Sequence, residues 1–222
     1  MAARKSPAPG LWITPGGRQR VRAPNPSYRC RVQFRTATES DVEAIVALVA
    51  HAYRGTGGDP GWTTEAHLFH GPRTDAADVR RTLAVPQDTL LVAERDGAIV
   101  ACCTVTDLGR AAYFGMFAVS PTLQGSGLGR AVLAEAERVA RDELGAAEMT
   151  MTVITTRDEL LAWYERRGYR RTGRVAPLPG EYAVHVRPGV EIHLETLTKP
   201  LVAERSVVEA SDGRAPSDNV GE

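Results

Sequence analysis

Short segments in which hydrophobic and polar positions alternate, or hydrophobic positions run together, recur along the chain. They lie at residues 32–36, 89–94, 98–106, 113–119, 148–154, 169–174 and 191–197. Because successive side chains of a strand point to opposite faces, these patterns predict β-strands with one or both faces buried. The pair Asp96-Gly97 predicts a tight hairpin between the second and third segments.

Hydrophobic residues three or four positions apart predict helices between these strands. They recur at residues 42–49, 75–83, 130–144 and 158–167. Pro86 ends the second helix because proline cannot continue it, and Gly145 is a plausible end cap for the third. Residues 51–75 are less regular, and we expect a short helix there at residues 62–69.

The order of these elements predicts an α/β fold with a mixed, largely antiparallel central sheet flanked by helices. Residues 1–28 are rich in proline and glycine, so we expect a flexible N-terminal arm. Residues 202–222 are polar and lack periodicity, which predicts a disordered C-terminal tail. The folded domain would span residues 29–201.

Charge and cysteine content narrow the class of protein. The 222 residues include 27 basic and 27 acidic ones, so no overall field favours nucleic acid or a membrane. No apolar run approaches the roughly 20 residues that span a bilayer, and the N-terminus lacks the apolar core of a secretory signal. Three cysteines, of which Cys102 and Cys103 are adjacent, predict free thiols and a cytoplasmic location. The five histidines lack zinc-ligand spacing, so we expect no metal.

A glycine-rich loop from Gln124 to Arg130 lies between a predicted strand and a predicted helix. Unpaired N–H groups at a helix start bind phosphate, and glycine lets the backbone approach it closely. A dinucleotide site would need Gly-x-Gly-x-x-Gly, and a P-loop would end in Gly-Lys-Ser/Thr. Here the pattern is Gly-x-Gly-x-Gly followed by arginine, and a tight turn without a ligand is the remaining alternative.

The segment Gln124-Gly-Ser-Gly-Leu-Gly129 resembles the Gln/Arg-x-x-Gly-x-Gly/Ala signature of the GNAT acetyltransferase superfamily. Phe117-Ala-Val-Ser-Pro121 resembles the strand that precedes it in that family, and Leu161-Ala-Trp-Tyr-Glu-Arg-Arg-Gly-Tyr169 resembles a later helix and strand. The resemblance covers about residues 32–198. It implies a GNAT fold and acetyl transfer from acetyl-CoA, without a metal, to a primary amine of a small molecule by direct attack, and it leaves room for a homodimer.

The resemblance also assigns the acetyl-CoA contacts. The pyrophosphate would lie on the glycine loop, and the pantetheine arm would bond to the preceding strand like an added strand. The residues concerned are Phe117, Ala118, Val119, Gln124, Gly125, Ser126, Gly127, Leu128, Gly129 and Arg130. This needs the strand at residues 148–154 to splay away. Many family members carry asparagine where this chain has Arg157, which we expect to contact a CoA phosphate or an acidic group of the acceptor.

The chemistry of acetyl transfer requires an acid for the leaving thiolate and a base for the amine. The resemblance implies that Tyr164 is the acid. For the base, Glu65 is the first candidate, and His67 and His70 are alternatives in the same segment.

Two classes of acceptor remain open. Arg73 and Arg157 would suit an acceptor with a carboxylate, whereas Asp59, Glu65 and Asp75 would suit a polycation. We expect Trp62, Glu65 and Arg73 to contact the acceptor.

Three other functions compete with this one. The chain could acetylate a protein or peptide amine, or serve as an acyl-CoA-binding regulatory module of GNAT fold with little catalysis. A binder of NAD-type nucleotides is the third. Tyr164 favours an enzyme over a regulatory module.

Overall fold

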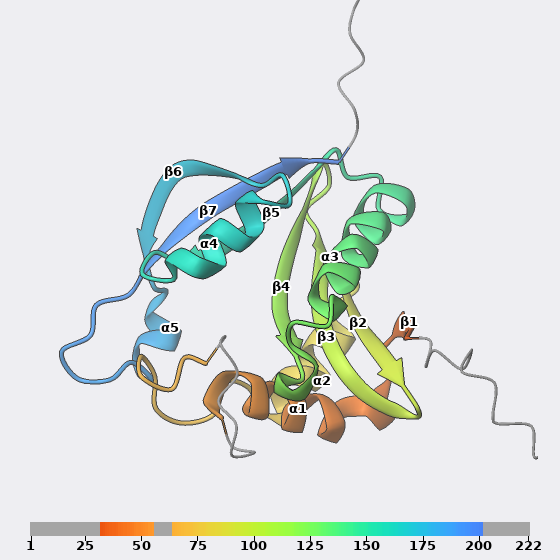
Figure 1. Cartoon of the computed structure of the whole chain (residues 1–222), viewed down its shortest axis with the longest axis horizontal. Coiled ribbons are helices and arrows are strands. Elements are labelled where there is room, and N and C mark those ends of the chain that lie inside the picture. The colour runs from red at the N-terminus through yellow and green to blue at the C-terminus, as the bar shows by residue number, and fades with distance from the viewer. Residues whose placement is uncertain (1–31, 56–63, 202–222) are drawn as a thin grey trace, which may run out of the picture. The chain divides into compact units, whose positions relative to one another are not determined.

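The computed structural model describes residues 32–55 and 64–201. In this part of the chain seven strands form one sheet in the order β1-β2-β3-β4-β5-β7-β6 (Figure 1). The strands are β1 (Gln33–Thr36), β2 (Asp88–Arg95), β3 (Ala98–Asp107), β4 (Ala111–Val119), β5 (Glu148–Ile154), β6 (Arg170–Pro177) and β7 (His193–Pro200). All neighbouring pairs are antiparallel except β4 and β5. The predicted mixed, largely antiparallel α/β fold is confirmed.

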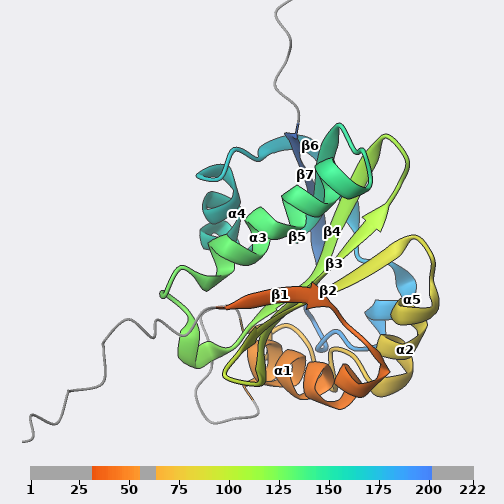
Figure 2. The ribbon, with the colours of Figure 1, turned by 90° about the vertical axis from the view of Figure 1, so that its right-hand side faces the viewer.

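Helices cover both faces of the sheet (Figure 2). On one face lie α1 (Val42–Arg54) and α2 (Ala76–Ala84), and on the other lie α3 (Leu128–Arg138) and α4 (Asp158–Glu165). A short helix, α5 (Gly180–Ala183), precedes β7. In the described part of the chain no helix is both long and apolar enough to cross a membrane.

The two adjacent cysteines mark the two halves of the hydrophobic core. Cys102 packs with the buried face of α1, whereas Cys103 packs with the buried face of α3. Both side chains are fully buried free thiols. Adjacent residues of a strand point to opposite faces, so the two cysteines enter different halves of the core, and β3 is buried on both sides as its apolar run predicts.

The sheet opens between β4 and β5. These strands pair in parallel only from Ala111 to Tyr113 on β4 and from Glu148 to Thr150 on β5. Beyond that point β5 continues along β7 and β4 continues along β3, so the two diverge (Figure 1). The expected splay of the 148–154 strand is confirmed, and it leaves one edge of β4 without a ladder partner among the described strands.

Several predicted boundaries need correction. Residues 64–69 do not form the expected helix: residues 66–68 make a turn and Phe69 forms an isolated bridge with Val186. The backbone of residues 68–70 is hydrogen-bonded to residues 185–187, and a local sequence pattern contains no information on such long-range bonds. The third helix begins at Leu128 and continues past Arg138 as a π-helix, and β7 begins at His193. The predicted arm and tail, residues 1–28 and 202–222, lie outside the described residues.

Candidate active site

The glycine loop leads from the open strand β4 into helix α3. After β4 a single turn of 3₁₀ helix, Pro121–Leu123, redirects the chain. Gly125 and Gly127 then have φ angles of 80° and 90°, a left-handed conformation that side chains disfavour. Gly127 caps the N-terminus of α3. The sequence therefore needs glycine at these two positions to make this turn.

This loop fits a phosphate group. Among the described residues, the N–H groups of Gly125, Gly127, Gly129 and Arg130 donate to no backbone carbonyl. They lie at the start of α3, where the helix dipole favours negative charge. The loop therefore offers the donors that the pyrophosphate of acetyl-CoA needs.

Gly129 also brings the loop against the open strand and helix α4. A Cβ atom at this position would lie 3.5 Å from Phe117 Cζ and 3.6 Å from Trp163 Cζ2. The centroids of the Phe117 and Trp163 rings are 6.1 Å apart. Loop, β4 and α4 therefore converge at the mouth of the splay.

A cationic cluster lies beside the loop, and sequence reasoning named only one of its members, Arg130. Arg167 stacks 3.5 Å from the Trp163 ring and donates to the Trp163 carbonyl at 2.6 Å. Burial lowers its pKa, and the nearby charges of Arg166 and Arg130 lower it further. Its Nε is buried and has no hydrogen-bond partner among the described residues. Three arginines in one place suit the phosphates of CoA, and only closeness in space adds Arg166 and Arg167 to the predicted Arg130.

Strand β4 is bulged where it leaves β5. Cys102 pairs with Ala118 and Thr104 pairs with Gly115, so Met116 and Phe117 together face one residue of β3. Met116 has a φ of 40°, which is uncommon for a side-chain-bearing residue. A bulge re-aims the backbone and ends regular pairing. Here it turns β4 at the place where the reacting groups would meet.

Tyr53 links helix α1 to this bulge. Its hydroxyl donates to the Phe117 carbonyl oxygen at 2.6 Å. Burial, followed by the nearby Glu65 charge, raises the pKa of Tyr53. The phenol therefore stays protonated at neutral pH and keeps this bond.

Glu65 is a buried carboxylate among arginines. Its side chain is 12% exposed, and its oxygens lie 3.8 Å from Arg54 Nη1 and 3.6 Å from Arg157 Nη1. Its backbone N–H donates to the Tyr53 carbonyl at 2.9 Å. Burial raises the pKa of Glu65, and the charges of Arg73, Arg157 and Arg54 oppose the shift. A carboxylate with a raised pKa is better suited to take a proton near neutral pH.

Tyr164 of α4 lies on the opposite side of the opening. It is 5% exposed, and its ring contacts Trp163 and Tyr169 edge-on, with centroids 4.9 and 5.7 Å away. Burial raises its pKa well above the ordinary value, and the strongest electrostatic neighbour is Tyr53. Arg157 is another neighbour. Tyr53 and Arg157 are therefore electrostatic neighbours of both Tyr164 and Glu65.

The structure also shows where the remaining predicted site residues lie. Arg157 lies against Glu65, on the acceptor side of the opening. His67 and His70 are exposed, and the His70 backbone bonds to His185. Asp75 accepts from the Asp78 N–H at 2.8 Å and so caps helix α2. Trp62 and Asp59 lie outside the described residues.

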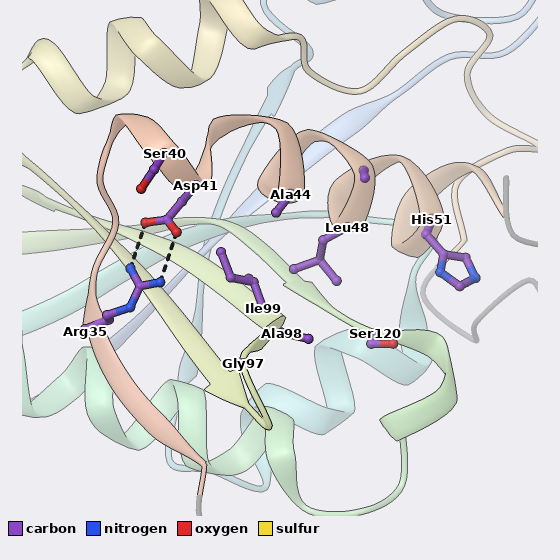
Figure 3. A pocket seen from close by; sticks show the side chains of 11 residues that line it. Arg35, Ser40, Asp41, Ala44, Leu48, His51, Gly97, Ala98, Ile99 and Ser120 are labelled. Atoms are coloured by element: carbon purple, nitrogen blue, oxygen red, sulfur yellow. Dashed lines mark hydrogen bonds and ion pairs between the residues drawn. The ribbon is translucent and has the colours of Figure 1, made fainter.

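A separate pocket of about 540 Å³ lies between α1 and the β2–β3 turn (Figure 3). At one end Arg35 donates two hydrogen bonds to Asp41, and His51 lies at the other end. Ser120 of its lining adjoins the glycine loop, but the pocket includes neither Glu65 nor Tyr164. The two residues that the sequence analysis proposed as base and acid therefore lie outside this pocket.

Comparison with known proteins agrees with this geometry. Residues 61–169 match the model of the acetyltransferase (GNAT) family. No curated protein matches the sequence.

Solved structures share the fold. An acetyltransferase-type protein from Salmonella typhimurium, with its cofactor acetyl-CoA, is 20% identical at a TM-score of 0.56, covering 86% of this chain and 99% of that one. The ribosomal-protein-S18-alanine N-acetyltransferase from Escherichia coli is 15% identical at a TM-score of 0.57, covering 80% and 99%. An N-acetyltransferase from Staphylococcus aureus Mu50 is 14% identical at a TM-score of 0.59, covering 78% and 99%.

Proposed function

We propose that this chain is an acetyl-CoA-dependent N-acetyltransferase of the GNAT family, whose model matches residues 61–169, and that it acetylates a primary amine of a small molecule by direct attack. The observation that carries this proposal is the meeting of Glu65 and Tyr164 around Tyr53 at the opening of the sheet. Acetyl-CoA supplies the thioester. The chain supplies the groups that hold it and move protons.

Direct attack is supported by the state of Cys102 and Cys103, the two cysteines among the described residues. An acetyl-enzyme route would need a reactive thiolate, which requires a lowered pKa and access to the substrate. Burial raises the pKa of Cys102 to about 12 and that of Cys103 well above its ordinary value. The Cys102 thiol donates to the Met116 carbonyl at 3.7 Å. Neither thiol suits a nucleophile, and such buried free thiols also support our proposal of a cytoplasmic location.

A small acceptor is supported by the hydrogen bonds that join residues 66–70, next to Glu65, to residues 185–187. The segment after Glu65 is bonded to residues 185–187: His70 N–H donates to His185 at 2.8 Å, and Arg187 donates to Leu68 and Ala66 at 2.9 Å. Phe69 also bridges to Val186. A polypeptide acceptor needs an open groove or strand edge to lie along. Two segments bonded across this side favour a compact acceptor.

In the proposed reaction, the acceptor nitrogen attacks as the neutral amine, and the Glu65 carboxylate takes the proton that the nitrogen loses, directly or through water. A carbon–nitrogen bond forms and the carbon–sulfur bond breaks. The Tyr164 hydroxyl gives its proton to the leaving sulfur and regains one from solvent for the next cycle. Its raised pKa keeps it protonated throughout the neutral range. The unpaired N–H groups of the loop and the free edge of β4 hold the donor meanwhile.

Thiol release over a panel of acceptors tests this proposal. The panel contains small primary amines and peptides with free N-termini, each with acetyl-CoA at saturation. We expect release with at least one class of small amine and little with the peptides. Mass spectrometry of the enzyme incubated with acetyl-CoA alone should show no covalent acetyl group. Preference for peptides, or a stable acetyl-enzyme that transfers to amine, would contradict the proposal.

A further inference from the structure

Arginines from three segments of the chain surround Glu65. This buried carboxylate lies among the guanidinium groups of Arg54, Arg73 and Arg157. Arg54 and Arg157 are only 10% exposed and pair with Glu65 itself. Arg73 is exposed, so an anionic group that enters from solvent can pair with it.

We propose that the acceptor amine carries an anionic group, in the first place a carboxylate, and that Arg73 binds it. This inference rests on the proposed function and adds the class of acceptor to it. The amine nitrogen would lie at Glu65, and the carboxylate would lie on the guanidinium of Arg73. An arginine presents paired N–H donors that match the two oxygens of a carboxylate.

Arg73 is the arginine of the three that is free to take a ligand. Arg54 donates from Nε to the Gly71 carbonyl at 2.8 Å and has a side chain only 10% exposed. Arg157 is equally buried against Glu65. Arg73 is exposed, and among the described residues it pairs with no carboxylate within ion-pair distance. Its guanidinium donors therefore face no competing anion there.

Arg73 is also positioned toward the reacting groups. Its Cζ atom lies 5.5 Å from the centre of the Tyr53 ring, and the hydroxyl of the same ring bonds to Phe117 on the open strand. Of the charges that act on Glu65, that of Arg73 has the largest effect. Glu65 and Arg73 both lie against Tyr53, so a short spacer between amine and carboxylate, as in an α- or β-amino acid, fits best.

A polycationic acceptor is disfavoured by the same observations. Of the acids that would hold a second positive charge, Asp75 is committed to capping α2. A polyamine would have to bring further positive charge beside three arginines, and like charges brought together cost several kcal/mol across an interface. Among the described residues, the positions of Asp75 and Arg73 therefore favour an acceptor with a carboxylate over a polycation.

The experiment compares matched amines in the full-length protein. β-Alanine, 2-aminoethylphosphonate, propylamine and putrescine have similar lengths but carry a carboxylate, a phosphonate, no charge and a second amine, together with a set of α-amino acids. We expect kcat/KM to be highest for an acceptor with a carboxylate. A higher value for the phosphonate would place a different oxyanion at Arg73, which overturns the carboxylate assignment.

Variants of Arg73 provide the second arm. Arg73→Gln should lower kcat/KM for the carboxylated acceptor about 10- to 100-fold, mainly through KM, since a charge-assisted hydrogen bond is lost. The loss for propylamine should be at least about tenfold smaller, since that amine has no anion for Arg73 to bind, and Arg73→Lys, which keeps the charge, should restore part of the loss. Arg81→Gln removes an exposed arginine of α2 that pairs with Asp78, and serves as the matched control.

The outcomes are distinguishable. Turnover of amines with no preference for an anionic group, or an equal loss on all amines in Arg73→Gln, overturns this inference and leaves the proposed function standing. Absence of thiol release with every amine overturns the proposed function, and the inference falls with it.

Discussion

The Tyr53 hydroxyl donates a 2.6 Å hydrogen bond to the backbone carbonyl of Phe117, 64 residues away. The bond joins helix α1 to the bulge of β4, in the part of β4 that has diverged from β5. It therefore fixes the strand that would hold the donor relative to the helix that precedes Glu65. The position of the reacting groups depends on a contact that no local sequence pattern contains.

Removing this bond should loosen the bulge. We expect Tyr53→Phe to lower the free energy of unfolding by about 1 kcal/mol, the net value of one hydrogen bond, plus the cost of an unsatisfied carbonyl. For a domain of this size this corresponds to a fall in Tm of about 2–4 °C. Acetyl-CoA affinity, measured by calorimetry, should fall as well. A variant with lower Tm and unchanged affinity would show that the bond serves stability alone.

The acid role of Tyr164 predicts a kinetic effect without a large stability effect. Tyr164→Phe should lower kcat by about 10²- to 10⁴-fold while KM for acetyl-CoA changes little, because general acid catalysis acts on the transition state. Tyr169→Phe is the matched control. Its hydroxyl donates to Glu137 at 3.1 Å within the core, so this variant should lose stability and retain kcat. Unchanged turnover in Tyr164→Phe would contradict the assignment.

Glu65 predicts a pH dependence of both stability and rate. Its folded-state pKa is raised above 4.5 by burial. Between 4.5 and the raised pKa the folded protein holds more protons than the unfolded chain, so the free energy of unfolding falls as pH rises through this window. Glu65→Gln should remove this fall, as denaturant titrations at several pH values would show. The same variant should lose the acidic limb of the kcat/KM profile. A profile that keeps this limb would place the base elsewhere.

Substituting a left-handed glycine of the loop should weaken acetyl-CoA binding, whereas substituting one elsewhere should affect only stability. Gly127→Ala places a side chain at a φ of 90° and should strain the loop by about 1–2 kcal/mol, weakening acetyl-CoA binding. Gly97→Ala, at a φ of 78° in the β2–β3 turn, imposes a similar strain in open space. It should lower Tm similarly and leave the dissociation constant of acetyl-CoA unchanged. Equal effects of both variants on binding would show that strain alone is responsible.

The join between β1 and α1 predicts sensitivity to acid. Arg35 donates to both oxygens of Asp41, at 2.7 and 3.0 Å, and these bonds hold the pKa of Asp41 well below its usual range. Their stabilisation is present above the ordinary aspartate pKa of about 3.9 and is lost as pH falls through the folded value. Asp41→Asn should cost about 1–3 kcal/mol at pH 7, with a difference from the unmodified protein that shrinks in acid. Glu39→Gln breaks the exposed pair with Arg80 and should cost under about 1 kcal/mol.

The donor side of the site could be predicted from the sequence because its determinants are local. Glycines 125 and 127 adopt the left-handed backbone that their turn requires, and α3 begins at once after them. The family resemblance added the splay of β5, which the short β4–β5 register confirms. The turn and the start of α3 depend on residues that are neighbours in the chain, whereas the splay was expected from the resemblance alone.

The acceptor side could not be predicted in the same way because its determinants are long-range. The Arg187 side chain bonds to Ala66 across 121 positions, and the Tyr53 hydroxyl bonds to Phe117 across 64. The helix expected at residues 62–69 is wrong over residues 64–69 because these tertiary bonds outweigh the local helical pattern. The three arginines around Glu65 come from three separate segments, so their closeness to one carboxylate is visible only in the fold.

The short pairing between β4 and β5 has a consequence for how fast the protein is degraded in a cell. Three residue pairs join two parts of one sheet, so a ligand that bonds along the open edge of β4 completes the sheet. A ligand that binds only the folded chain adds RT ln(1 + [L]/Kd) to the free energy of unfolding, about 2.7 kcal/mol at a hundredfold excess over Kd. Resistance to proteolysis should therefore track acetyl-CoA supply, and starved cells should clear this protein faster than well-fed ones.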